Sequence, residues 1–164
     1  MPQELSEIIA FLEETPEVVR RLSEGISADE LKVRADDGSF SFVEQVCHLR
    51  DIEQEGYGAR IERILREELP TLADLDGARL AAERRYNEQR FEEGLGAFSQ
   101  SRRQSTSALR AATAEQLSRR GLFEGVGPVT LRGLASLMYE HDAAHRGELR
   151  ALREQLVSRR AAVE

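Results

Sequence analysis

Residues 131–156 read LRGLASLMYEHDAAHRGELRALREQL, and their large apolar side chains recur at steps of three and four. Steps of this size place side chains on one face of an α-helix. The face comprises Leu131, Leu134, Met138, His141, His145, Leu149, Leu152 and Leu156. The pattern therefore predicts a helix that is capped by Thr130, ends near Val157 and carries two histidines on its core-facing stripe.

Three further segments show the same helical periodicity, and they cover residues 2–24, 41–68 and 87–112. Residues 71–88 fit a long crossover that holds at most a short helix, and residues 121–128 fit a loop. No segment shows the alternation typical of a β-strand. We therefore predict an all-α protein, a single-domain four-helix bundle over residues 1–164 with a long crossover between helices 2 and 3.

Local signals mark where two of these helices begin or bend. Ser41 and Glu44 form a capping box, which predicts the start of the second helix. Thr15-Pro16 interrupts the first helix, because proline has no N–H to donate within a helix. A kink or a restart is expected at that point.

The composition limits the classes of protein to which the chain can belong. Its 23 basic and 30 acidic side chains give a formal charge of −7 over 164 residues, whereas proteins that bind the nucleic-acid backbone are usually basic. The single cysteine, Cys47, can form neither an internal disulfide nor a thiolate zinc cluster. The start MPQELSEIIAFLEETPE lacks a signal-peptide pattern, and no apolar run is long enough to span a membrane. We expect a cytoplasmic protein with no nucleic-acid or membrane partner.

The three histidines are the strongest candidates for chemistry. His141 and His145 are four residues apart, which places both imidazoles on one helix face about 6 Å apart, a spacing that suits two ligands of one metal ion. Burying them is costly unless a hydrogen-bond network or a metal satisfies their nitrogens. His48 lies on the flank of the buried arc of the second helix and can point across the bundle. Three imidazoles with an open position are typical of catalytic metal sites, while core histidines with only a structural role are the alternative.

At this point the sequence resembles the DinB-like (YfiT-like) metal-binding family. The similarity lies in SFVEQVCHLRDIE at residues 41–53, in GPVTLRGLASLMYEHDAAHRGELRAL at residues 127–152, in the crossover LPTLADLDGARLAAER at residues 69–84, and in Thr15-Pro16. The resemblance implies a four-helix bundle with a long second connection. It also implies a divalent metal ion held by the three matching histidines, and often a homodimer. Relatives in this family include S-transferases and isomerases that use low-molecular-weight thiols.

Two carboxylates are candidates for supporting the metal. Glu148 lies where the H-x-x-x-H pattern of the family is often followed by Gln, and it is a candidate general base one turn beyond His145. Glu53 lies inside the apolar arc of the second helix. It either pairs with an arginine such as Arg60 or orients the ligand His48 from behind.

Several other polar residues are expected to have no role in the site. Asp51 and Asp142 are predicted to face water, and Cys47 is predicted to be a small buried apolar side chain. A basic line on the last helix is expected to be a solvated face, with anion binding as the alternative. This line consists of Arg146, Arg150 and Arg153.

Together these observations predict a metal-dependent enzyme that acts on a small-molecule substrate, as a thiol-dependent S-transferase or a hydrolase. The metal would be a single divalent ion, and imidazole ligands are compatible with zinc, nickel or iron. A low-molecular-weight thiol is a further expected cofactor, because a metal with three neutral ligands favours an anionic fourth ligand. The alternative is a non-catalytic, stress-related protein that binds a metal or a small ligand.

Overall fold

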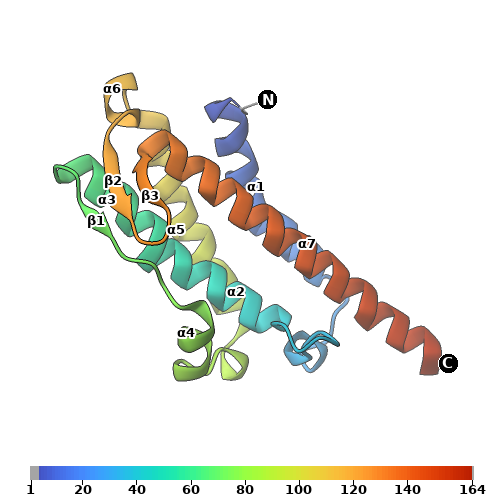
Figure 1. Ribbon diagram of the computed structural model, residues 1–164. Helices are drawn as coiled ribbons and strands as arrows, with labels where there is room; N and C mark the ends of the chain where they lie inside the picture. Colours follow the sequence, from blue (N-terminus) through green and yellow to red (C-terminus); the bar gives the residue numbers. More distant parts are fainter. Residues whose placement is uncertain (1–3, 164) are drawn as a thin grey trace.

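The computed structural model describes residues 4–163, and within them four long helical segments form the predicted bundle (Figure 1). Helix α1 packs against α5 and α7, and α2 packs mainly against α5. The second segment is a continuous run of α2, a π-helical turn η2, and α3. The segments are α1 (Leu5–Ser23), α2 (Phe42–Asp51) with η2 (Ile52–Tyr57) and α3 (Gly58–Arg66), α5 (Phe91–Ala111), and α7 (Leu131–Val163).

A long crossover joins α3 to α5, as predicted, and runs alongside α3 and α2 (Figure 1). It contains β1 (Thr71–Leu72), the short helix α4 (Gly77–Glu83) and the 3₁₀ turn η3 (Tyr86–Glu88). The Tyr86 hydroxyl donates a hydrogen bond of 2.6 Å to Asp51 on α2. The prediction that Asp51 faces water was therefore wrong. Its side chain is buried because the crossover covers this face of α2, which the periodicity of α2 alone does not reveal.

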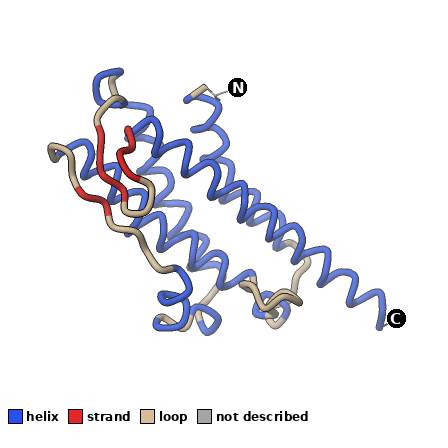
Figure 2. The backbone as a smooth tube through the Cα atoms, viewed as in Figure 1, coloured by secondary structure: helices blue, strands red, loops and turns tan. Residues whose placement is uncertain are grey.

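A small three-stranded sheet corrects the prediction that the chain has no strands. In it β1 pairs in parallel with β2 (Arg120–Phe123), which pairs antiparallel with β3 (Gly127–Thr130). The strands lie together near the start of α7 (Figure 2). They are two to four residues long and include Gly121 and Pro128, so they are too short to show an alternation in the sequence. The predicted loop at 121–128 is consequently a β-hairpin.

The ends of the long helices agree with the capping signals. The Ser41 hydroxyl accepts a hydrogen bond from the Glu44 N–H, and the Thr130 hydroxyl accepts one from the Gly133 N–H. The expected start of the first helix at residue 2 lies outside the described residues. Helix α7 continues beyond the predicted end to Val163. Two short elements, η1 (Glu30–Lys32) and α6 (Ala114–Leu117), lie in the remaining connections.

Helix α1 continues through Pro16 and does not restart there. Because Pro16 has no N–H, the carbonyl of Leu12 one turn earlier loses its helical donor. Arg102 on α5 supplies the missing donor, since its Nη1 atom lies 2.9 Å from the Leu12 carbonyl oxygen. The interruption expected at Thr15-Pro16 is thus a docking point for a side chain from another helix.

The same arginine forms a buried ion cluster in the middle of the bundle. Its Nη2 atom donates to Glu53 on η2 at 2.9 Å, and its Nη1 atom donates to Asp142 on α7 at 2.5 Å. Asp142 also accepts a hydrogen bond from the Thr15 hydroxyl of α1. The prediction that Asp142 is solvated was wrong, because its side chain faces α5 and α1 in the interior and is 0% exposed. All four long segments contribute to this cluster.

The basic line on α7 is only partly a solvated face. Arg146 is buried and donates to the Thr15 hydroxyl and to the Phe11 carbonyl of α1. Arg150 is exposed, as predicted. Arg153 is half-buried and donates to two carbonyls at the end of α1. The expectation failed for Arg146 because the surface of α7 that contacts α1 is wider than the apolar stripe of α7 and includes this side chain.

The apolar core is divided into two clusters by this polar layer. The cluster near the sheet includes Leu12 and Met138, whereas the cluster at the other end includes Val19 and Leu149. On α1 and α7, the buried polar side chains already described lie between Leu12 and Val19 and between Met138 and Leu149, respectively.

Among the described residues, none of the helices combines the length and apolar character that a membrane span needs.

We predict that Arg102→Met lowers the free energy of unfolding by about 3–5 kcal/mol, because it leaves two carboxylates in the core without their cation. The same substitution at Arg66, which pairs with Glu62 on the surface, should cost less than about 1 kcal/mol. Urea unfolding followed by circular dichroism measures both values. Equal losses in the two variants would contradict the central role of the cluster.

Candidate metal centre

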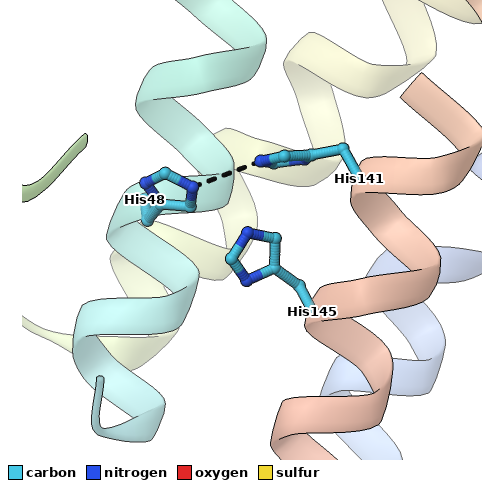
Figure 3. Close-up of side chains that lie close together, drawn as sticks. All are labelled: His48, His141 and His145. Atoms are coloured by element: carbon cyan, nitrogen blue, oxygen red, sulfur yellow. Dashed lines mark hydrogen bonds between the residues drawn. The ribbon is translucent and has the colours of Figure 1, made fainter. Parts of the chain in front are cut away.

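The three histidines meet across the gap between α2 and α7 (Figure 3). His48 comes from α2, and His141 and His145 lie one turn apart on α7. The Nε2 atoms of His48 and His141 are 3.2 Å apart, and one nitrogen from each of the three rings lies within 4.8 Å of the others. The expectation that His48 points across the bundle toward the pair on α7 therefore agrees with the structure.

This separation fits a single transition-metal ion. A zinc–imidazole bond of about 2.0–2.1 Å and tetrahedral angles place two ligand nitrogens about 3.3 Å apart. The 3.2 Å between the Nε2 atoms of His48 and His141 is close to that value. His145 has the ring nearest to His141, with centroids 4.4 Å apart, and completes a set of three donors. The three residues could therefore hold one divalent ion.

The electrostatic environment keeps two of these imidazoles neutral. Burial, reinforced by the neighbouring His145, lowers the pKa of His48 to about 4. Burial also lowers the pKa of His141 to about 2, with the other two histidines adding to the effect. Since a metal binds the lone pair of a neutral imidazole, both rings are in the correct state at neutral pH. The buried Nδ1 of His48 has no hydrogen-bond partner among the described residues.

Gln45 on α2 orients His145, and the sequence interpretation missed this residue. Its side-chain oxygen lies 2.7 Å from Nδ1 of His145. An amide oxygen can only accept, so Nδ1 carries the proton and the lone pair of His145 is on Nε2. Gln45 precedes His48 by three residues and therefore lies on the same face of α2. That spacing could have indicated that Gln45 supports the histidines, but glutamine is too common in helices for the spacing alone to single it out.

Glu148 reaches the same nitrogen of His145 from α7. One carboxylate oxygen lies 3.2 Å from His145 Nδ1 and accepts a hydrogen bond of 2.7 Å from the Gln45 amide. The hydrogen bond with His145 lowers the pKa of Glu148, against the opposing effect of burial. The side chain is 49% exposed, so an ionised carboxylate lies at the edge of the centre where water can reach it.

Glu53 and Cys47 lie near the histidines in the sequence but do not contact them through hydrogen bonds. Of the two roles considered for Glu53, the structure shows the ion pair with an arginine, which is Arg102 and not Arg60. Among the described residues, no hydrogen bond joins Glu53 to a histidine. Cys47 is buried against the crossover, and burial raises the pKa of its thiol to about 11, consistent with its predicted apolar character.

Aromatic rings and the crossover form the walls of the centre. The Phe40 ring lies 5.6 Å from the His48 ring, and the Tyr57 ring lies 5.7 Å from the His141 ring. Gly77, at the start of α4, packs directly on His48, since a Cβ atom at this position would lie 2.7 Å from the Cε1 of His48. Only glycine permits this close approach of the crossover to the ring.

The fold and the three histidines together define a class of protein, a helical bundle with a candidate metal centre between two of its helices. The model of the DinB superfamily matches residues 12–149, so the chain belongs to that superfamily. In fold the chain is similar to YfiT from Bacillus subtilis, with a TM-score of 0.85 and 21% sequence identity over 95% of this chain and 93% of that one. YfiT is described as a probable metal-dependent hydrolase with an unusual four-helix bundle topology. None of the curated proteins matches the chain.

Removing a ligand histidine should remove the metal. Protein purified without a histidine tag should hold about one transition-metal ion per chain. His141→Ala and His145→Ala should reduce this content to near zero, and should lower the melting temperature only when metal is supplied. Elemental analysis and thermal melting test both effects. Glu140→Ala, on the exposed side of α7, is the control and should keep its metal. Unchanged metal content in the histidine variants would refute the ligand assignment.

Removing the group that orients His145 should weaken metal binding without abolishing it. Gln45→Leu should lower the metal affinity about 10–100-fold, because the acceptor that fixes the His145 tautomer is lost. Competition with a chromophoric chelator measures this change. The same substitution at Gln54, which is exposed on η2, should leave the affinity unchanged. Equal affinities in the two variants would show that Gln45 has no orienting role.

Proposed function

We propose that the protein is a metal-dependent hydrolase of a small molecule. In this proposal His48, His141 and His145 are the metal ligands, and Glu148 is the proton acceptor. The observation that carries it is the convergence of three histidine nitrogens within 4.8 Å in a partly exposed gap. The description of YfiT as a probable metal-dependent hydrolase supports the same reaction class.

Each of the surrounding residues has a definable task in such a site. A divalent ion held by the three imidazoles would make water more acidic and would polarise a carbonyl oxygen. Gln45 keeps the lone pair of His145 on Nε2 by accepting a hydrogen bond from the Nδ1–H group. Glu148 is ionised and half exposed. In this proposal its side chain turns from Nδ1 of His145 toward the open position of the ion, takes the proton from the attacking water and passes it to the leaving group. His145 is 13% exposed, so a small molecule can approach from solvent.

We favour hydrolysis over the thiol-dependent S-transfer that the family also includes. Hydrolysis needs only water and a proton acceptor, and the half-exposed Glu148 at the edge of the centre is our candidate for that acceptor. Transfer needs a low-molecular-weight thiol as a further substrate, and no side chain at the centre points specifically to one. The choice among zinc, nickel and iron stays open, because imidazole accepts all three. The homodimer and the cytoplasmic location remain predictions.

Hydrolysis should depend on Glu148 independently of metal binding. With zinc-loaded protein and a panel of activated esters and lactones, Glu148→Gln should lower kcat about 10²-fold or more, because the variant cannot accept a proton. Its zinc content should stay at the wild-type level, and Glu140→Gln should be fully active. If the loaded wild-type protein hydrolyses no probe faster than free zinc does, the hydrolase proposal fails and a non-catalytic binding role is favoured.

A further inference from the structure

Three arginines are buried among the described residues, and they differ in how their charge is compensated. Arg102 forms ion pairs with Glu53 and Asp142, and Arg146 forms one with Glu14. Within the described part of the chain, Arg60 has no carboxylate within 4.0 Å, although its side chain is only 5% exposed. Arg60 is therefore a cation that the protein keeps in its interior without a counter-ion.

The contacts of Arg60 account for two of its three donor nitrogens. Nε and Nη2 both donate to the carbonyl oxygen of Ala73 in the crossover, at 3.3 and 2.9 Å. The guanidinium carbon lies 5.2 Å from the centre of the Tyr57 ring and 4.3 Å from that of Phe123, so two aromatic faces partly stabilise the charge. Among the described residues, Nη1 has no hydrogen-bond partner.

The free nitrogen fills the room that a side chain at position 56 would need. A Cβ atom at Gly56 would lie 3.2 Å from Nη1 of Arg60 and 3.4 Å from a methyl group of Leu75. Any side chain larger than that of glycine would therefore crowd Nη1. Nη1 is not fully shielded from solvent, in contrast to the buried and unpartnered Nε of Arg102, so a small group can reach this donor.

Arg60 also belongs to the surroundings of the metal centre. The Tyr57 ring that contacts its guanidinium is also the ring that lies 5.7 Å from His141. The crossover connects the two places a second time, because Ala73 accepts from Arg60 and Gly77 packs on His48. One tyrosine ring and one short stretch of chain thus separate the free donor from the three histidines.

We infer that Arg60 binds a carboxylate of the substrate, at a distance of several atoms from the bond that is cleaved at the three histidines. The inference rests on the proposed function. It narrows the substrate class to small acids that carry a carboxylate for Arg60 and, several atoms away, either a hydrolysable bond or another carboxylate that can reach the metal. A guanidinium with an unsatisfied donor recognises a carboxylate through a charge-assisted hydrogen bond. Binding there would compensate the one buried arginine that lacks an ion pair.

Asp74 is the acidic group that competes with such a ligand. It acts on Arg60 through space and raises the pKa of the guanidinium, while burial lowers it. Its carboxylate lies on the exposed side of the crossover and accepts a hydrogen bond from the Leu75 N–H at 2.9 Å. Because water screens an exposed charge, Asp74 compensates Arg60 only weakly. Removing the Asp74 charge should therefore strengthen the binding of an external anion.

The test compares simple carboxylates on zinc-loaded protein by isothermal titration calorimetry. Acetate has one carboxylate and can occupy either the metal or Arg60, but not both at once. Succinate, glutarate and adipate offer two carboxylates at increasing separation. At least one dicarboxylate should bind about tenfold or more tightly than acetate. Arg60→Gln should remove this preference while leaving zinc content unchanged. Asp74→Asn should increase the preference, and circular dichroism checks that each variant is folded.

The outcomes separate the two proposals. Wild-type protein that holds no metal refutes the hydrolase proposal, and this inference with it. Zinc-loaded wild type without a dicarboxylate preference, or with a preference that persists in Arg60→Gln, refutes the carboxylate site alone. If Arg60→Gln does not fold, Arg60→Lys and Asp74→Asn decide the question. The lysine variant should reduce the preference, because an ammonium lacks the planar fork of donors, and no change in either variant refutes the site.

Discussion

The ion cluster around Arg102 holds the four long helical segments at one level. Its guanidinium, 2% exposed, binds Glu53 on η2, Asp142 on α7 and the Leu12 carbonyl that Pro16 leaves without a donor on α1. Taking these charges out of water is costly, and hydrogen bonds recover that cost only in a narrow geometry. The cluster therefore constrains the axial position of each segment more strictly than the apolar contacts on either side of it can, because apolar packing is non-directional.

The candidate metal centre lies at this same level, and the position of its histidines follows from the cluster. Asp142 and His141 are neighbours in the sequence, so the contact that fixes Asp142 against Arg102 also fixes the height of His141 on α7. Glu53 fixes the second segment in the same way, five residues after His48. A shift of α7 by one turn would both break the ion pairs and separate His141 from His48. The structural cluster and the histidine centre thus share one polar layer between the two apolar clusters.

Much of this arrangement could be predicted from the sequence, and the failures have a common physical cause. The stripe that contains His141 and His145, the Ser41 and Thr130 caps and the crossover all depend on local spacing, which sequence periodicity reports directly. The burial of Asp51 and Asp142 depends on partners at a separation of about 35 to 40 residues, Tyr86 and Arg102. Strand β1 likewise depends on pairing with the distant β2, whereas β2 and β3 form a local hairpin that is too short to show an alternation. Periodicity shows which face of a helix is apolar, but not what covers its polar faces.

The topology of the bundle explains why the crossover closes one side of the candidate centre. Helix α2 packs mainly on α5, and α7 packs mainly on α1, so the boundary between α2 and α7 is narrow and is occupied by polar side chains. The connection from α3 to α5 is long because it runs back along this second segment (Figure 1). On its way it packs Gly77 on His48 and presents the Ala73 carbonyl to Arg60. A short connection would not affect the ion cluster, but it would remove both of these contacts. Hence the helices set the position of the three histidines, and the crossover adds a further wall of the candidate centre.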